Sequence, residues 1–311
     1  MISFEKQAFK LFAHQYSRNN VYRSYCDLIN ISPSDVNKLT DIPFLPVELF
    51  KSHRVSCTET TEMIFESSGT GGTVSKHHVA SLNTYEHSFN TGFSHFYGTP
   101  SDYHILALLP GYIERPNASL IYMCRDLIRQ SNSAFSGFYL DQFKELHGVL
   151  TRLNQQPKKT LLIGVSFALL DFCEVYPISV PNTIIMETGG MKGRRKELIR
   201  EELHMRLKKG FGVDHIHSEY GMTELLSQAY SKANGVFQPT PSMKVFVRDV
   251  HDPKKVSETG SGGLNIIDLS NKDSCAFIAT QDLGKCHENG TFEVLGRFDA
   301  SDVRGCSLMT A

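Results

Sequence analysis

Short apolar runs alternate with longer amphipathic segments between residues 62 and 219, and this alternation is the strongest constraint on the fold. A short apolar run is typical of a buried strand, and a longer amphipathic segment is typical of a helix. The expected strands lie at 62–66, 104–109, 134–139, 160–165, 183–187 and 213–217, and the expected helices lie near 84–96, 118–130, 141–153, 166–175 and 192–209. The alternation therefore predicts an α/β sheet that is covered by helices on both faces.

The two ends of the chain have a different texture. Residues 3–29 carry apolar side chains at helical spacing and predict two helices, whereas residues 42–51 form an extended, proline-punctuated segment. After about residue 235, short apolar runs separated by Gly, Asp and Asn predict antiparallel strands. We therefore expect an α/β core at 1–235 and an antiparallel β subdomain with a hinge-like C-terminus at 236–311.

Composition argues against several classes of protein. The 32 Lys and Arg residues nearly balance the 33 Asp and Glu residues, so a net charge of −1 offers no long-range attraction for nucleic acid. No apolar run is long enough to cross a membrane, and the N-terminus lacks the apolar core of a signal peptide. The seven cysteines are scattered without CxxC spacing, which argues against a disulfide framework. The chain is therefore expected to be cytoplasmic and reduced.

A loop rich in glycine and hydroxyl side chains follows the first expected strand. Residues 67–76 read Ser67, Ser68, Gly69, Thr70, Gly71, Gly72, Thr73, Val74, Ser75 and Lys76. Glycines let backbone N–H groups converge, hydroxyls add donors and a lysine adds positive charge, which together suit a polyphosphate. The patterns GxxxxGK[ST] and GxGxxG are both missing, so this is neither a Walker loop nor a dinucleotide loop. A flexible surface loop is the alternative interpretation.

Four further motifs are expected on loops that follow strands. They are 186–190 (METGG), 220–224 (YGMTE), 280–284 (TQDLG) and 296–299 (GRFD). A glycine pair such as that of the first motif allows a flat ring to lie against the backbone. Together with residues 67–76, the order and spacing of these motifs resemble the adenylate-forming enzymes, the superfamily of acyl-CoA synthetases and luciferases. The resemblance covers nearly the whole chain. It implies the N-terminal domain of that fold, with α/β sheet layers and a small antiparallel β subdomain.

The resemblance also implies ATP and Mg²⁺ as ligands. The residues expected to cradle the phosphates are Ser67, Ser68, Gly69, Thr70 and Gly71. The residues expected around adenine and ribose are Gly189, Gly190, Tyr220, Gly221 and Asp282, and Arg297 is expected to bind phosphate or ribose. In the same comparison Lys76 would face the leaving pyrophosphate, Thr223 the α-phosphate and Glu224 the Mg²⁺.

A narrower resemblance rests on residues 41–53 (DIPFLPVELFKSH) and 302–308 (DVRGCSL). These segments are similar to the LuxE-like acyl-protein synthetases, the long-chain-fatty-acid–protein ligases. Members of that family activate a fatty acid as acyl-AMP, move the acyl group to an enzyme cysteine and pass it to a reductase partner. Cys306 is the candidate acyl acceptor, because a thiolate is the competent nucleophile and Arg304 would favour that form. A small buried cysteine is the alternative interpretation.

Further expectations concern the lid domain, the partners, the acyl pocket and a basic cluster. The small C-terminal lid domain of the superfamily, with its catalytic lysine, is expected to be absent, because the chain ends at Ala311 soon after the hinge-like Asp299. An acyl-carrier partner and a homo-oligomer are both compatible with the sequence.

The candidates for an acyl pocket are Phe93, Phe96, Tyr97, Leu109 and Tyr112, with core packing as the alternative. A basic cluster that ends at Arg200 is interleaved with glutamates and predicts a solvated helix face.

Two alternative functions remain open at this point. One is an acyl- or aryl-CoA ligase of the phenylacetate-CoA ligase type, which would use coenzyme A and would not need Cys306. The other is a non-catalytic nucleotide-binding partner subunit, which would bind ATP without exchanging pyrophosphate.

Overall fold

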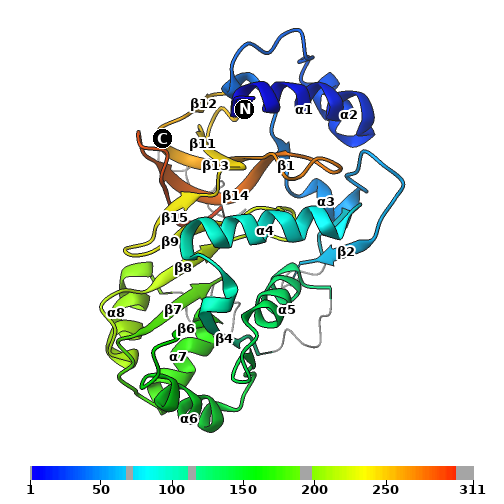
Figure 1. The fold of residues 1–311 in the computed structure, drawn as a ribbon. Coiled ribbons are helices and arrows are strands. Elements are labelled where there is room, and N and C mark those ends of the chain that lie inside the picture. Colours follow the sequence, from blue (N-terminus) through cyan, green and yellow to red (C-terminus); the bar gives the residue numbers. More distant parts are fainter. Residues whose placement is uncertain (1, 68–72, 111–116, 190–197, 299–311) are drawn as a thin grey trace, which may run out of the picture.

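The computed structural model describes residues 2–67, 73–110, 117–189 and 198–298 (Figure 1). Within these residues one sheet of 13 strands runs through the molecule in the order β12-β11-β13-β14-β15-β10-β9-β8-β7-β6-β4-β5, with β1 paired to β14. The strands from β5 to β8 are parallel, and those from β8 to β12 are antiparallel. The sheet therefore joins an α/β half to an antiparallel half.

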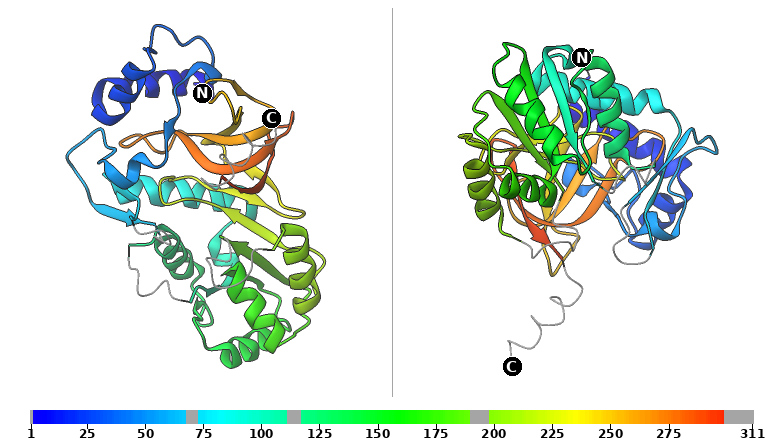
Figure 2. Two further views of the ribbon diagram at one scale, coloured as in Figure 1. Left: turned by 180° about the vertical axis from the view of Figure 1, so that it is seen from behind. Right: turned by 90° about the horizontal axis from the view of Figure 1, so that it is seen from below.

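The parallel half confirms the predicted α/β arrangement. Its strands are β4 (Tyr103–Leu108), β5 (Gly137–Phe138), β6 (Lys159–Val165), β7 (Thr183–Thr188) and β8 (His217–Tyr220). Its helices are α4 (Leu82–Tyr97), α5 (Ser119–Ser131), α6 (Phe143–Leu153), α7 (Ser166–Val175) and α8 (Arg200–Phe211), and they flank the strands (Figure 2). Every residue of β4 and all but the first residue of β6 are buried, as expected for strands that are covered on both faces.

The antiparallel half shares its core with the N-terminal helices. Its strands are β9 (Ala229–Ser231), β10 (Val236–Pro239), β11 (Met243–Arg248), β12 (Val256–Ser257), β13 (Gly260–Asp268), β14 (Phe277–Cys286) and β15 (Phe292–Arg297). The elements packed on them are α1 (Phe4–Arg18), α2 (Asn20–Leu28), a 3₁₀ turn at Leu39–Asp41, β1 (Leu45–Pro46) and α3 (Leu49–Ser52). Gln15 Nε2 donates to the Asn271 carbonyl over 2.8 Å, and Tyr22 Oη donates to the Pro43 carbonyl over 2.6 Å. The first bond ties α1 to the segment before β14, and the second ties α2 to the segment before β1.

A separate two-stranded hairpin carries the loop at 67–75. It consists of β2 (Met63–Glu66) and β3 (Lys76–Val79), which pair antiparallel with Glu66 opposite Lys76. The sequence predicts a strand at 62–66, and the structure places that strand in this hairpin beside the large sheet. A short 3₁₀ turn at Pro100–Asp102 then leads from α4 into β4.

One predicted strand is misplaced. The segment 213–217 (VDHIH), predicted as a strand, is irregular up to its last residue and follows Gly212 (φ +61°), and Ile216 within it is buried in the core. The strand begins only at its last residue, His217, which pairs with Met186. The pattern is misleading because β8 itself is polar and reads HSEY. No separate lid domain lies in the described part of the chain, and no described helix is long and apolar enough to cross a lipid bilayer.

Candidate active site

A cleft of about 1980 Å³ brings together segments that lie far apart in the sequence. The predicted site residues that line it are Ser67, Gly189, Tyr220, Gly221, Thr223, Glu224, Asp282 and Arg297. The hairpin, the ends of β7 and β8, and the β14–β15 pair therefore meet at one place. The remaining predicted positions Ser68, Gly69, Thr70, Gly71, Gly190 and Cys306 lie outside the described residues.

Sheet topology explains why two of the motifs meet. β7 and β8 are adjacent and parallel, with Thr188 opposite Glu219, so Gly189 and Tyr220 both lie at the carboxyl edge of the sheet. Ligands of α/β proteins bind at this edge, because the loops that leave the strands there surround a crevice. Gly189 adopts φ +68°, a conformation that residues with a side chain rarely tolerate.

Tyr220, Asp282 and Arg297 form a connected group on one wall of the cleft. Tyr220 Oη donates to Asp282 Oδ2 over 2.7 Å, and Arg297 Nε donates to Asp282 Oδ1 over 3.1 Å. Asp282 and Arg297 face each other in the β14–β15 register. Burial raises the pKa of Tyr220 well above its ordinary value, and the Asp282 carboxylate adds to that rise. The phenol therefore stays a donor, and it holds a buried carboxylate at the rim of the cleft.

Thr223 and Glu224 are held in place through their backbone carbonyls. His77 Nδ1 lies 2.8 Å from the Thr223 carbonyl, and Asn271 Nδ2 donates to the Glu224 carbonyl over 2.9 Å. Burial raises the pKa of the Glu224 carboxyl, and a hydrogen bond with Ser75 opposes that rise. Ser75 and His77 both belong to the hairpin region, so the loop at 67–75 and the Thr223–Glu224 pair are positioned together.

The lysine of the loop points elsewhere in this structure. Lys76 Nζ lies 3.7 Å from Glu66 Oε1 across the hairpin, and about half of its side chain is exposed. Glu66 lines the cleft and Lys76 does not. A second lysine, Lys51 of α3, does line the cleft, and its charge opposes the rise that burial causes in the pKa of Glu224. Sequence reasoning overlooked Lys51, although it belongs to the distinctive segment at 41–53.

Another part of the cleft lining is mainly apolar. It contains Tyr85 of α4, Ala118, and Leu120 and Met123 of α5. The aromatic candidates named from the sequence do not contribute to it: Phe93, Tyr97 and Leu109 are buried in the core, and Phe96 packs against that core. Tyr112 lies outside the described residues.

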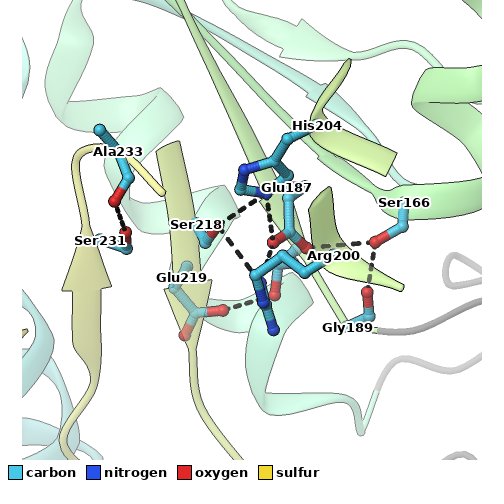
Figure 3. A network of polar contacts seen from close by, with 10 residues as sticks. Ser166, Glu187, Gly189, Arg200, His204, Ser218, Glu219, Ser231 and Ala233 are labelled. Carbon is cyan, nitrogen blue, oxygen red and sulfur yellow. Dashed lines mark hydrogen bonds and ion pairs between the residues drawn. The ribbon is translucent and has the colours of Figure 1, made fainter. Parts of the chain in front are cut away.

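A buried polar cluster at the carboxyl edge of β7 forms part of the cleft lining (Figure 3). Glu187 accepts hydrogen bonds from Arg200 Nη1 over 2.5 Å and from Ser166 Oγ over 3.1 Å, and His204 Nε2 lies 3.4 Å away. Burial alone would raise the pKa of Glu187, but the hydrogen bond from His204 and the charge of Arg200 hold it below its ordinary value. The prediction of a solvated face is therefore wrong for Arg200, which also lies over the ring of Phe237.

A comparison with models of protein families shows which family has this sequence pattern. The model for "Acyl-protein synthetase, LuxE" matches residues 3–311. The chain belongs to the acyl-protein synthetase (LuxE) family. A comparison with functionally curated proteins finds no match. The narrower resemblance seen in residues 41–53 and 302–308 is thereby confirmed at the level of the family.

Solved structures of adenylate-forming acyl-CoA ligases share the fold. A 2-hydroxyisobutyryl-CoA ligase in complex with 2-HIB-AMP matches with a TM-score of 0.67 and 10% identity over 94% of this chain and 67% of that chain. ATP-bound MatB from Rhodopseudomonas palustris matches with a TM-score of 0.58 and 15% identity over 75% of this chain and 47% of that chain. AMP-bound MenE from Bacillus subtilis matches with a TM-score of 0.54 and 18% identity over 78% of this chain and 63% of that chain. The chain spans about half the length of the MatB structure. These likenesses confirm the predicted fold.

Proposed function

We propose that this member of the acyl-protein synthetase family activates a carboxylic acid with ATP as an acyl-adenylate and then transfers the acyl group to a cysteine thiol. The observation that carries the proposal is the convergence of Ser67, Tyr220 and Asp282 on one cleft, because those three stretches hold the motifs of a nucleotide site. Family membership favours a fatty acid as the substrate and a cytoplasmic enzyme that works with an acyl reductase.

The nucleotide would occupy the wall formed by Tyr220, Asp282 and Arg297. The Asp282 carboxylate is a strong acceptor for two ribose hydroxyls, and the Arg297 side chain is 73% exposed and free to turn toward a phosphate. The residues proposed for the phosphates are Ser67, Ser68, Gly69, Thr70, Gly71, Lys76 and Thr223, and those proposed for adenine are Gly189, Gly190, Tyr220 and Gly221. The bound nucleotides of MatB and MenE are consistent with ATP as the substrate.

Glu224 fits a Mg²⁺ ion that arrives with the phosphates. Mg²⁺ usually keeps several waters and is bound through one or two carboxylates together with substrate phosphate oxygens. Among the described residues no group of three or more His, Cys, Asp or Glu side chains could hold a metal ion, so a cage made of protein alone is not available there. A single buried carboxyl beside Ser75 suits the shared arrangement. When bound, the ion would neutralise phosphate charge.

The reaction needs two anions to be brought together. A carboxylate oxygen of the acid attacks the α-phosphorus of ATP, the bond to the bridging oxygen breaks and pyrophosphate leaves. Positioning and charge neutralisation carry most of such catalysis, since the protein need not form a covalent bond in this step. The apolar wall around Tyr85 and Met123 would hold the tail of the acid, and Lys51 would add positive charge near Glu224.

In the second step a thiolate attacks the acyl carbon, a thioester forms and AMP leaves with the oxygen that came from the acid. The cysteines of the described residues are poor candidates, because they are buried or half-buried and none lines the cleft. Burial raises the pKa of Cys26, Cys57 and Cys286 to about 12. Cys306 is the remaining cysteine and is our proposed acceptor.

The test is carboxylate-dependent exchange of labelled pyrophosphate into ATP, run with short, long and aromatic acids. We expect exchange that depends on both Mg²⁺ and an acid. Asp282→Asn should raise the KM for ATP by roughly 10- to 100-fold, the usual effect of losing a charged hydrogen bond. The control is Asp214→Asn, an exposed site away from the cleft. Background exchange with every acid, while ATP still binds, would favour the non-catalytic subunit instead.

The identity of the thiol is tested separately, because the structural neighbours include CoA ligases. Cys306→Ser should leave pyrophosphate exchange intact and abolish acyl-enzyme that survives denaturation and is released by hydroxylamine. A variant that forms acyl-CoA at the wild-type rate and lacks any acyl-enzyme intermediate would assign the chain to the CoA ligases.

A further inference from the structure

The proposed chemistry leaves two buried carboxyls of the cleft unused, Glu187 and Glu219. Glu187 is paired with Arg200, whereas Glu219 has no ion-pair partner among the described residues. Glu219 lies at the end of β8, directly before Tyr220, and only 7% of it is exposed. Its Oε2 accepts a hydrogen bond from Thr188 Oγ1 over 2.5 Å, and Thr188 is its only hydrogen-bond partner among the residues that the structure describes. Figure 3 shows Glu219 on the strand next to the cluster around Glu187.

The two carboxyls belong to opposite faces of the sheet. In the β7–β8 register Glu187 is opposite Ser218, and Thr188 is opposite Glu219. Because side chains alternate along a strand, Thr188 and Glu219 lie on one face of the sheet, and Glu187 and Ser218 lie on the other face. Glu187 bonds to residues of α7 and α8, whereas the charge of Glu219 acts on Tyr85 of α4 and Cys124 of α5. Glu219 therefore belongs to the wall that would hold the acid.

The second oxygen of Glu219 packs against a glycine. A methyl group added at Gly221 would lie 2.5 Å from Glu219 Oε1, closer than any real contact, so only a glycine at this position lets the oxygen lie there. Both Glu219 and Gly221 line the cleft. A carboxylate oxygen that lines the cleft and has no donor among the described residues is an incomplete hydrogen-bonding site.

Gln228 is a second side chain beside Gly221 whose oxygen lacks a hydrogen-bond donor among the described residues. It is 4% exposed and lines the cleft, and its Cγ lies 3.6 Å from the position of the same added methyl at Gly221. Among the described residues its Oε1 is buried without a hydrogen-bond partner, while its Nε2 makes a long bond of 3.4 Å to the Leu226 carbonyl. Each of the two side chains that flank Gly221 therefore has an oxygen for which the described part of the chain supplies no donor.

We propose that Glu219 and Gln228 form a subsite for a hydrogen-bond donor carried by the acid, so that the substrate bears a hydroxyl or an ammonium group near its carboxylate. The inference rests on the proposed function. A plain methylene chain would leave these acceptors unsatisfied, and a second carboxylate would meet the charges of Glu219 and Glu187. The donor would lie near the carboxylate because Glu219 and Thr188 directly precede Tyr220 and Gly189, the proposed nucleotide contacts.

Pyrophosphate exchange with matched acids tests the proposal. The probes are octanoic acid and its 2- and 3-hydroxy and 2- and 3-amino derivatives. At least one substituted acid should exceed octanoic acid in kcat/KM by roughly 10- to 100-fold, since sites built to bond a substrate donor reject the analogue that lacks it. Glu219→Leu should remove that preference and retain activity with octanoic acid. Glu201→Leu, an exposed residue that also lines the cleft, should keep it.

Glu219→Gln separates the two kinds of donor and covers a failure of the leucine variant to fold. Glutamine still accepts a bond from a hydroxyl, so a preference for a hydroxy acid should survive, whereas a preference for an amino acid should be lost with the negative charge. Equal activity with octanoic acid and every derivative in the wild type would overturn the proposal. So would an unchanged preference in a folded Glu219→Leu protein.

Failure of the proposed function has a different signature. If no acid supports exchange, the same acids are compared by saturation-transfer NMR with AMP present. Stronger saturation transfer to a substituted acid than to octanoic acid, lost in Glu219→Leu, would uphold the subsite without the chemistry. Equal binding of all the acids would refute the subsite as well.

Discussion

Glu219 should make the stability of this protein fall as pH rises through the neutral range. Burial raises the pKa of its carboxyl from 4.5 to about 7, the Glu187 charge adds to the rise, and the Thr188 hydrogen bond opposes it. Between these two values the folded state binds more protons than the unfolded state. The free energy of unfolding therefore falls with pH in this window, whereas below pH 4.5 the cost is absent and above pH 7 it is complete.

The size of the effect follows from the shift. A rise in the pKa from 4.5 to about 7 corresponds to about 3 kcal/mol, most of which should be lost between pH 5 and pH 8. The neighbours of Glu219 on α4, α5 and β9 are Tyr85, Cys124 and Tyr230, and burial raises the pKa of each, so they stay neutral in this range. Glu187 on β7 stays ionised because its pKa is lowered.

The assay is urea unfolding of wild type and Glu219→Gln at pH 5 and pH 8. Far-UV circular dichroism is the suitable probe, because the chain has no tryptophan. The free energy of unfolding of the wild type relative to the variant should fall by about 2–3 kcal/mol between the two pH values. Glu288→Gln, in an exposed turn before β15, is the control and should follow the wild type. Parallel pH profiles for wild type and Glu219→Gln would refute the argument, since they would mean that Glu219 is solvated.

Three further predictions concern the surroundings of the cleft. Arg200→Met leaves Glu187 buried without its charged partner and should lower the free energy of unfolding by about 3–5 kcal/mol. The control Arg206→Met removes an exposed ion pair and should lower it by less than about 1 kcal/mol. Equal losses of the two variants in urea unfolding would contradict this prediction. Glu224→Gln should raise the Mg²⁺ concentration needed for half-maximal pyrophosphate exchange by about tenfold, and an unchanged Mg²⁺ dependence would remove Glu224 from the metal site. His77→Gln retains a donor for the Thr223 carbonyl and should keep more exchange activity than His77→Leu; equal activities would show that the hydrogen bond is not needed.

The fold could be predicted largely because buried strands must be apolar. β4 and β6 are covered on both faces, so their sequences are nearly continuous apolar runs that the alternation pattern detects. The alternation pattern missed β8 because that strand carries Ser218 and Glu219, polar side chains that belong to the buried polar cluster and to the cleft. A strand that supplies functional groups breaks the rule by which strands are found. The boundary proposed at residue 235 stays a prediction, although residues 8–55 share a core with β10 to β15.

The candidate site could be predicted only where the sequence holds a motif. Tyr220, Asp282 and Gly189 lie in recognisable patterns, and the structure brings them to one cleft. His77 and Arg200 carry no local signal, because their partners Thr223 and Glu187 become neighbours only through the topology. A lone histidine or an arginine on a charged helix is compatible with many environments. Distant pairing of this kind has to be seen in three dimensions.

The central claim is that an oxygen of the acid bonds to the α-phosphorus of ATP in this cleft. The direct measurement is a reaction with a carboxylic acid labelled with ¹⁸O in both carboxyl oxygens, with hydroxylamine present to accept the acyl group. Mass spectrometry of the products should find one ¹⁸O atom in AMP for each acyl hydroxamate formed. Label in inorganic phosphate, or hydroxamate with unlabelled AMP, would contradict the account.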